Sequence, residues 1–280
     1  MPSRSTIAIT VGAAVVGSLA YARLSSKTPF GIVGPLSLTS LKLESSVQLN
    51  HNTKKLRFAL PDPSTTSGLA VTTALLSISR PPANGQRTPV FRPYTPTSDP
   101  QAHGYLEFMI KQYPNGEQST FMHSLKPGDS VTFMRTPLGV SWKPNQHPHV
   151  ALIAGGAGIT PMYSLLNGIL SNPEDKTRVT LVWGVNTDAD IFLKDEFAEL
   201  EKKHPGRFTT HYVVSHPEDG SPYPKGYVTK ELLEKAGLSA GGENVKVMLS
   251  GPPTMEKALV AKGSGVLAQL GYKPSQIHRF

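Results

Sequence analysis

Residues 149–166, HVALIAGGAGITPMYSLL, decide the fold of the C-terminal half of the chain. An apolar run, Val150 to Ala154, ends at a glycine-rich turn, and Thr160-Pro161 opens a segment whose apolar residues have helical spacing. Thr160 suits a helix N-cap and Pro161 the first helical position, where the missing N–H costs nothing. The stretch therefore predicts a strand, a tight turn and a helix.

The glycine turn is a candidate anion site. Gly155, Gly156 and Gly158 would let backbone N–H groups approach a bound group closely, and the N-terminus of the following helix favours a negative charge. Pyrophosphate is the obvious ligand. However, the pattern is G-x-G-x-x-P, and a tight turn without any ligand would use the same glycines. This stretch alone leaves both interpretations open.

Composition and charge exclude several classes of protein. The 280 residues are enough for a short extension and two domains. There are no cysteines, which excludes disulfides, cysteine-ligated metals and thiol nucleophiles, and the nine histidines lack metal-ligand spacing, so we expect no metal site. The net charge of +8 includes no long basic run, which disfavours nucleic acid. It fits a positive face for an acidic protein partner, although a merely solvated surface would explain it equally well.

The N-terminal segment has the character of a membrane anchor. Eighteen uncharged residues lie between Arg4 and Arg23, and as a helix they would cover about 27 Å. We expect residues 1–30 to form an anchor helix and linker, with a cleaved secretory signal or a cleaved organelle presequence as alternatives. Moderate hydrophobicity with basic flanks fits the mitochondrial outer membrane, and the endoplasmic reticulum membrane is the alternative location.

The pattern of predicted strands and helices changes once along the rest of the chain. Residues 31–145 contain short strand-like segments with turn punctuation, which predicts a small antiparallel β-barrel. Residues 146–280 alternate strands with helices, which predicts a doubly wound parallel sheet. The expected strands are 46–49, 56–60, 75–79, 105–110, 130–134, 149–154, 178–184, 208–215 and 245–250, and the expected helices are 161–171, 192–203, 229–236 and 254–270.

Two turns are placed to bind nucleotides at the parallel sheet. Ligands of such sheets bind beyond the carboxyl ends of the strands. The glycine turn lies at one such end, and residues 250–253, Ser-Gly-Pro-Pro, lie at another. Two turns of this kind on one edge favour a real nucleotide site.

An extended segment of the barrel is suited to a flavin dinucleotide. In residues 91–99, FRPYTPTSD, Arg92 and Tyr94 would share one face of a strand while Thr95 points to the other. A flavin dinucleotide needs a cation for its pyrophosphate, an aromatic face against its ring and a donor near N5. The alternative is a proline-rich edge strand with a solvated arginine.

Together these segments resemble the flavoprotein pyridine-nucleotide cytochrome reductase family, most closely its NADH-cytochrome b5 reductase branch of the fungal, mitochondrial membrane-anchored form. The resemblance covers nearly the whole chain and rests on the order and spacing of its motifs. These are LNHNTKKLRFALP, FRPYTPTSD, IKQYPNGEQST, LKPGDSV, LIAGGAGITPMY, NTDADIFLKDEF, GYVTKELL, LSGPPTM and LGYKPSQIHRF. The resemblance implies a ferredoxin-reductase-like fold, with an FAD-binding barrel followed by an NAD(P)H-binding domain.

The resemblance also implies which residues bind the cofactors. Thr95, Lys111 and Ser250 would lie at the reacting atoms, with Thr95 near flavin N5 and Lys111 near the nicotinamide. The remaining FAD residues would be Arg92, Pro93, Tyr94, Ile110, Gly116, Gln118, Ser119 and Thr160. The NADH site would be shaped by Gly156, Gly158, Pro161, Met162, Ser215, Gly251, Pro252, Pro253 and Met255, with the aromatic Phe280 packed near the flavin.

The implied activity is electron transfer from NADH through FAD to cytochrome b5 or a similar acidic haem protein, which requires no acid–base pair. The part of the chain outside the membrane is expected to be monomeric. A related ferredoxin- or quinone-type flavin reductase is one alternative, and a degenerate membrane-tethered nucleotide-binding protein is another.

The chain departs from the family pattern at four positions. Ala157 replaces a threonine, Thr136 a glycine, Ser250 a cysteine and Ser215 an aspartate. Ala157 removes a hydroxyl near the nucleotide, and Ser250 is expected to weaken hydride positioning. In the family, the aspartate carboxylate would bind the adenosine ribose and repel the 2′-phosphate of NADPH. Ser215 therefore predicts a reduced preference for NADH, with NADPH as a second donor.

Overall fold

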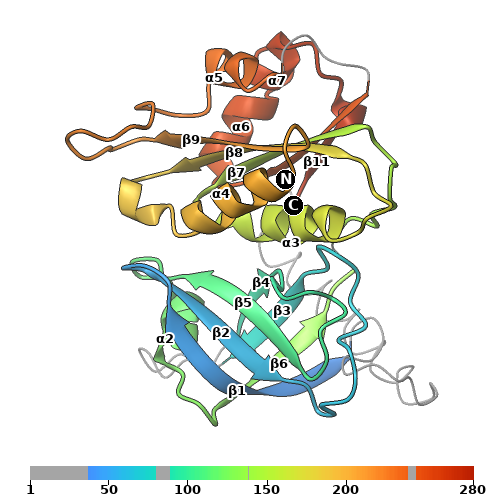
Figure 1. Ribbon diagram of the computed structural model, residues 1–280. Helices are drawn as coiled ribbons and strands as arrows, with labels where there is room; N and C mark the ends of the chain where they lie inside the picture. The colour runs from blue at the N-terminus through green and yellow to red at the C-terminus, as the bar shows by residue number, and fades with distance from the viewer. Residues whose placement is uncertain (1–36, 80–88, 138, 239–243) are drawn as a thin grey trace, which may run out of the picture.

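The computed structural model describes residues 37–79, 89–137, 139–238 and 244–280, which form two sheets, one above the other in Figure 1. The predicted N-terminal anchor lies outside these residues. So does Asn84-Gly85, a dipeptide whose sequence predicts a turn between two strands. Within the described ranges, no helix is long and apolar enough to cross a membrane.

The first sheet is an antiparallel half-barrel of six strands in the order β4-β3-β6-β1-β2-β5. Inward-pointing side chains alternate with solvated ones, as in β3, where every second residue is buried. Phe58, Phe108 and Phe133 form its centre, with ring centroids 5.2–5.9 Å apart. The strands are β1 (Leu38–Gln48), β2 (Thr53–Ala59), β3 (Leu75–Ser79), β4 (Val90–Tyr94), β5 (Tyr105–Lys111) and β6 (Ser130–Arg135), and helix α2 (Glu117–Ser124) lies between β5 and β6.

The second sheet is parallel, with five strands in the order β11-β10-β7-β8-β9. The central strand β7 is buried along its whole length, as expected for a parallel sheet covered on both faces. The strands are β7 (His149–Gly155), β8 (Arg178–Val185), β9 (Phe208–Val214), β10 (Val245–Ser250) and β11 (Ile277–Arg279). The α-helices are α3 (Ile159–Leu170), α4 (Lys194–Lys203), α5 (Lys230–Lys235), α6 (Pro253–Val260) and α7 (Val266–Gln269), and the 3-10 turns are η3 (Gly156–Gly158), η4 (Asp188–Asp190) and η5 (Pro274–Gln276).

Several elements differ from the sequence prediction. Strand β1 begins at Leu38, eight residues earlier than expected, and β11 was not predicted. The single helix expected over 254–270 is wrong, because α6 ends at Val260 and α7 begins at Val266. Gly263 between them has a φ of +78°, and a Cβ on Gly265 would lie 2.5 Å from the backbone nitrogen of Ala261. The left-handed backbone at Gly263 interrupts the helix, because α-helical residues have negative φ, and the close approach at Gly265 leaves no room for a side chain in the turn.

The start of α3 also differs from the prediction. A 3-10 turn, η3, precedes it, so the N-cap is Gly158 and Thr160 lies inside the first turn. The Thr160 hydroxyl donates to the carbonyl of Ala157 at 3.2 Å. Pro161 is the third helical residue, where its missing N–H still costs no hydrogen bond, because the first N–H groups of a helix have no acceptor within it.

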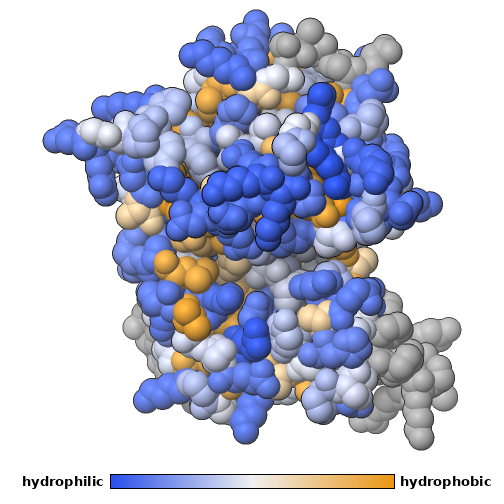
Figure 2. All heavy atoms as spheres, viewed as in Figure 1, coloured by the Kyte–Doolittle hydropathy of each residue, from blue (hydrophilic) through white to orange (hydrophobic). Residues whose placement is uncertain are grey.

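The two halves contact each other through both polar and apolar side chains. Met109 of β5 packs into the core of the second half, as do Leu49 and Val71 at its margin. On the face shown in Figure 2, hydrophobic atoms gather near this boundary, while most of the remaining surface is hydrophilic.

Candidate functional site

A cleft of about 1110 Å³ lies between the two halves. Its walls are β4, β5 and the first turn of α2 on the barrel side, and the turns after β7 and β10 with the 278–280 segment on the other. This volume exceeds that of a typical pocket for one small ligand. The predicted site residues that line it are Arg92, Pro93, Tyr94, Thr95, Lys111, Gly116, Gln118, Ser119, Gly158, Thr160, Pro161, Ser250, Gly251, Pro252, Pro253 and Phe280.

The other five predicted residues do not line the cleft. Ile110 belongs to the barrel core and Met162 to the core of the second half, and each is at most 1% exposed. Met255 stands behind the turns, against Gly155 and Gly251. Gly156 belongs to η3, and Ser215 follows the end of β9. Ile110 and Met162 can therefore support a cofactor only by packing or through their backbone.

Arg92 presents a cation to the barrel side of the cleft. Its backbone carbonyl accepts a 3.0 Å hydrogen bond from Ser77 across the β3–β4 pair. Its guanidinium donates to the carbonyl of Phe91 at 2.8 Å, and none of the carboxylates in the described ranges forms an ion pair with it. A guanidinium without a counter-charge, beside a cleft, is suited to a phosphate group.

Tyr94 presents a phenol on the same strand. Its ring packs against the barrel core. Burial raises the pKa of Tyr94 to about 12, which outweighs the opposite effect of Arg92. The phenol is therefore protonated at neutral pH and can donate a hydrogen bond while its ring covers a ligand.

The first turn of α2 offers backbone rather than side-chain donors. Gly116 is the N-cap. Ser119 Oγ accepts from the backbone N–H of Tyr113 at 3.1 Å and donates to the carbonyl of Gly116 at 3.0 Å, so it closes the turn. A Cβ on Gly116 would lie 2.5 Å from that hydroxyl oxygen. The N–H groups of this first turn, which lack helical acceptors, remain available to an anion.

Gln118 turns its side chain away from the cleft and into the barrel. Its amide nitrogen donates to Ser77 Oγ at 2.9 Å, and its amide oxygen accepts from the hydroxyl of Ser79. The side chain is 2% exposed. Only the backbone of Gln118 can therefore serve the cleft, a distinction that the sequence motif does not contain.

The two turns of the parallel sheet touch one another because β7 and β10 are neighbours. A Cβ on Gly158 would lie 2.1 Å from the carbonyl oxygen of Ser250. One on Gly155 would lie 2.4 Å from the sulfur of Met255 and 2.8 Å from Pro252 Cδ. These two glycines are thus required by the close approach of the turns themselves.

Gly156 has a different role. Its φ is +52°, in the left-handed region, and a Cβ there would meet nothing within 4 Å. Its carbonyl accepts a 3.0 Å hydrogen bond from the indole of Trp183. The Trp183 hydrogen bond therefore holds the turn on the side of the Gly156 carbonyl, whereas the side to which a Cβ would point is open. Together with the Arg92 cation, the Tyr94 phenol and the α2 N–H groups, this donor set fits a flavin dinucleotide and a nicotinamide dinucleotide.

Phe280 is held in place rather than frayed. Its N–H donates to the carbonyl of Leu249 at 3.0 Å, which extends the β10–β11 pairing. Its ring lies 4.8 Å from that of His278, edge to face. An aromatic side chain therefore lines the cleft next to the turn after β10.

Ser215 lies at the carboxyl end of β9, beside the end of β8. Its hydroxyl is within 3.4 Å of the carbonyl oxygens of Val185 and Asn186 and 3.0 Å from the Nδ1 atom of His216. No carboxylate occupies this position, as the sequence indicated.

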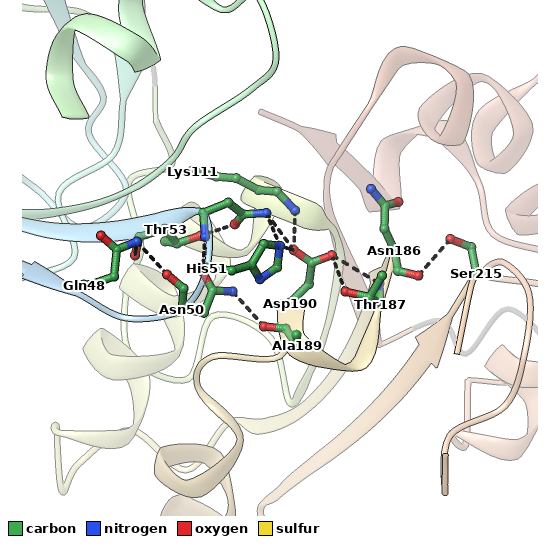
Figure 3. A network of polar contacts seen from close by, with 11 residues as sticks. Gln48, Asn50, His51, Thr53, Lys111, Asn186, Thr187, Ala189, Asp190 and Ser215 are labelled. Carbon is green, nitrogen blue, oxygen red and sulfur yellow. Dashed lines mark hydrogen bonds and ion pairs between the residues drawn. The ribbon is translucent and has the colours of Figure 1, made fainter. Parts of the chain in front are cut away.

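Lys111 has a partner that the sequence did not reveal. Its ammonium nitrogen lies 2.7 Å from Asp190 Oδ1, on the other half of the molecule. Figure 3 shows the pair within a polar network that joins the β1–β2 turn to η4. Burial works to raise the pKa of Asp190, but the hydrogen bond and charge of Lys111 and the hydrogen bond from Asn52 hold it below its ordinary value.

Sequence reasoning missed other cleft residues. Tyr113 and Asn115 flank Gly116 within a motif already singled out, so their position carried a usable signal. His278 and Arg279 also belong to a quoted motif, LGYKPSQIHRF, whereas residues from irregular segments such as Thr72 and Gly139 had no such signal. The missed lining residues are Thr72, Ala74, Met109, Tyr113, Asn115, Glu117, Pro137, Gly139, His278 and Arg279.

Comparison with known proteins agrees with this division of the chain. The oxidoreductase FAD-binding domain family matches residues 40–141, and the oxidoreductase NAD-binding domain family matches residues 152–261. The crystal structure of the cytochrome b5 reductase domain of Ulva prolifera nitrate reductase superposes with a TM-score of 0.82 at 28% identity, over 91% of this chain and 100% of that one. The fold and cleft thus define a two-domain oxidoreductase, ferredoxin-reductase-like, that uses FAD and NADH.

Comparison with curated relatives identifies the family within this class of oxidoreductases. A protein of Pyricularia oryzae named NADH-cytochrome b5 reductase 2 is 46% identical over 86% of this chain and 75% of its own length. One of the same name from Aspergillus clavatus is 42% identical over 99% of this chain and 91% of its own. The chain belongs to the NADH-cytochrome b5 reductase family.

Proposed function

We propose that this chain is a membrane-anchored reductase that passes electrons from NADH through FAD to cytochrome b5 or a similar acidic haem protein. The observation that carries the proposal is the cleft shared by the two domains. Arg92 lines this cleft together with the paired turns of the parallel sheet, and it has no carboxylate partner in the described ranges. The names of the curated relatives support cytochrome b5 as the acceptor.

The protein's contribution to this reaction is placement. When bound, FAD can take a hydride from NADH and release electrons one at a time. Arg92 would hold the flavin pyrophosphate, and Tyr94 would cover the ring and ribityl chain. Gly158 and Ser250, where the two turns touch, line the cleft on the side where the nicotinamide would bind. Thr95 and Lys111 line the same cleft, where they would contact the reacting rings.

The absorption spectrum of the purified full chain tests the cofactor assignment. We expect a yellow protein with one FAD per chain, which bleaches when NADH is added without oxygen. Arg92→Met should lower the FAD content several-fold without unfolding the protein, because the pyrophosphate loses its cation. A colourless wild-type protein would overturn the proposal.

The acceptor is tested by electron transfer to purified cytochrome b5, ferredoxin and a quinone. We expect cytochrome b5 to be preferred and its rate to fall as salt is added, because the net charge of +8 attracts an acidic partner through a screened potential. A preference for ferredoxin or quinone would favour the related reductase class and contradict this acceptor.

The location proposed is the mitochondrial outer membrane, with residues 1–30 as the anchor and the remainder as a monomer. The 18 uncharged residues between Arg4 and Arg23 support it. Fractionation of cells that express the full chain tests it. Recovery in the endoplasmic reticulum membrane, or in no membrane, would contradict the location.

NADPH is proposed as a second electron donor because of Ser215. A hydroxyl at the end of β9 cannot repel a 2′-phosphate as a carboxylate would. Ser215→Asp should raise the ratio of kcat/KM for NADH to that for NADPH by about tenfold, or about 1.4 kcal/mol. An equal ratio in wild type and Ser215→Asp would rule the idea out.

A further inference from the structure

We propose that Asp190 is a positioning residue that ties the two domains together and holds the Lys111 ammonium at the wall of the cleft. Neither residue type nor spacing in the sequence singled out Asp190. The inference concerns the approach of the nicotinamide to the flavin and is independent of the acceptor and of the membrane.

The contacts of Asp190 come from both sides of the domain boundary (Figure 3). Its Oδ1 accepts from Lys111 Nζ at 2.7 Å and from Asn52 Nδ2 at 3.2 Å, both on the barrel. The imidazole of His51 lies 3.8 Å away. One carboxylate oxygen, Oδ1, therefore accepts both hydrogen bonds that the barrel donates to Asp190.

The other oxygen belongs to the second domain. Asp190 Oδ2 accepts from the backbone N–H of Thr187 at 3.1 Å and from its hydroxyl at 3.3 Å, which forms a capping box for η4. The side chain of Asp190 is 4% exposed and that of Lys111 is 13% exposed. The ion pair is therefore shielded from solvent, and its carboxylate is held at η4 by two hydrogen bonds from Thr187.

Lys111 links this pair to the reaction site, because it ends β5 and lines the cleft. A second contact runs parallel to the pair: Asn50 Nδ2 donates to the carbonyl of Ala189 at 2.8 Å. Elsewhere along the boundary, Met109 packs into the apolar core of the second domain, and the N–H of Thr72 donates to Ser164 Oγ at 3.3 Å. The Lys111–Asp190 pair is thus a charged contact across the boundary, next to the cleft that Lys111 lines.

The variant Asp190→Asn tests this role, because an amide oxygen can still accept from Thr187 while the charge that holds Lys111 is lost. We expect the rate of flavin reduction by NADH to fall about tenfold, with a change in KM for NADH below twofold, since a small misplacement of reacting groups costs rate. Asp190→Glu should recover much of the rate. The control is Asp188→Asn, on the same turn, whose carboxylate accepts hydrogen bonds from Ser221 Oγ and from the backbone N–H of Glu218, both in its own domain.

Hydrogen exchange gives a readout that does not depend on turnover. In Asp190→Asn, amides of residues 48–53 on the barrel should exchange faster, although the substitution lies on the other domain, and Asp188→Asn should leave them unchanged. If Asp190→Asn does not fold, Lys111→Met removes the same ion pair from the barrel side and leaves the Thr187 contacts of Asp190 intact. Amides of residues 186–190 on the other domain should then exchange faster. Unchanged flavin reduction and exchange in a folded Asp190→Asn, or equal effects in Asp188→Asn, would overturn the inference.

Discussion

At the scale of single residues, the site depends on glycines for two distinct reasons. Gly156 needs a left-handed backbone, whereas Gly155 and Gly158 leave space for neighbouring atoms. The second reason is the more restrictive, because backbone atoms such as the Ser250 carbonyl cannot rotate away as a flexible side chain can.

Gly158→Ala should therefore damage the site. Its Cβ would lie 2.1 Å from the Ser250 carbonyl oxygen, so the turns after β7 and β10 would have to separate. We expect kcat/KM for NADH to fall by about a hundredfold and thermal stability to drop. The control is Gly184→Ala on β8, whose Cβ would meet only ordinary contacts at 3.5 Å. A fully active Gly158→Ala would show that these turns can move apart freely.

His149 predicts a pH dependence of stability. It is 5% exposed at the start of β7, and burial, with a smaller effect of Arg178, lowers its pKa to about 4. The guanidinium of Arg178 donates to Nδ1 at 3.2 Å, which leaves Nε2–H to donate to Thr180 at 3.0 Å. Below about pH 6.5 the unfolded chain takes up this proton first, so the free energy of unfolding should fall between pH 6.5 and 4, by at most about 3 kcal/mol.

Denaturant unfolding of wild type and His149→Gln at several pH values checks this expectation. The variant should show a shallower dependence between pH 6.5 and 4, because glutamine does not titrate. The exposed histidine His103 gives the control variant His103→Gln. Parallel curves for wild type and His149→Gln would contradict the assignment.

At the scale of elements, the contact between α3 and the segment before β3 is unusually close. Gly168 of α3 faces Val71, and a Cβ on Gly168 would lie 2.9 Å from Val71 Cγ2. Val71 is β-branched and packs against the core of the second domain, so it has little freedom to turn aside.

Gly168→Ala should consequently lower the melting temperature, although alanine in a helix interior would ordinarily stabilise it by about 1 kcal/mol. The double variant Gly168→Ala with Val71→Ala should be more stable than the sum of the single changes, because the smaller side chain makes room. Thermal unfolding of all four proteins measures this. A stabilised single variant Gly168→Ala would show that the contact yields easily.

Local patterns predicted the regular elements best. Strand β3 lies at 75–79 as expected, because alternation over five residues defines it. The helix over 254–270 was wrong because its break depends on backbone conformation, namely the left-handed Gly263 and the close approach of Gly265 to Ala261. In the site, Arg92 and Tyr94 were predictable from their own chemistry. Asp190 was not, since it meets Lys111 across 79 residues of sequence.

At the scale of the whole molecule, all the cleft residues that the structure describes lie after residue 71. A chain of residues 37–280 should therefore bind FAD and be reduced by NADH at a rate within about twofold of the full chain, since placement of the two cofactors governs the rate. The full chain, but not the shortened one, should remain with membranes after a high-salt wash. Loss of FAD from the shortened chain would show that residues 1–36 support the barrel.

The hydrogen bond from Trp183 to Gly156 gives the molecule an optical property. The chain has two tryptophans, and Trp142 is placed elsewhere, where its indole donates to Asp175 at 2.8 Å. The Trp183 indole is 1% exposed and lies directly beneath the turn where the nicotinamide is expected to bind. Its fluorescence should therefore respond to events at that turn, while that of Trp142 supplies a constant background. Each molecule thus carries its own reporter of cleft occupancy, without any attached dye.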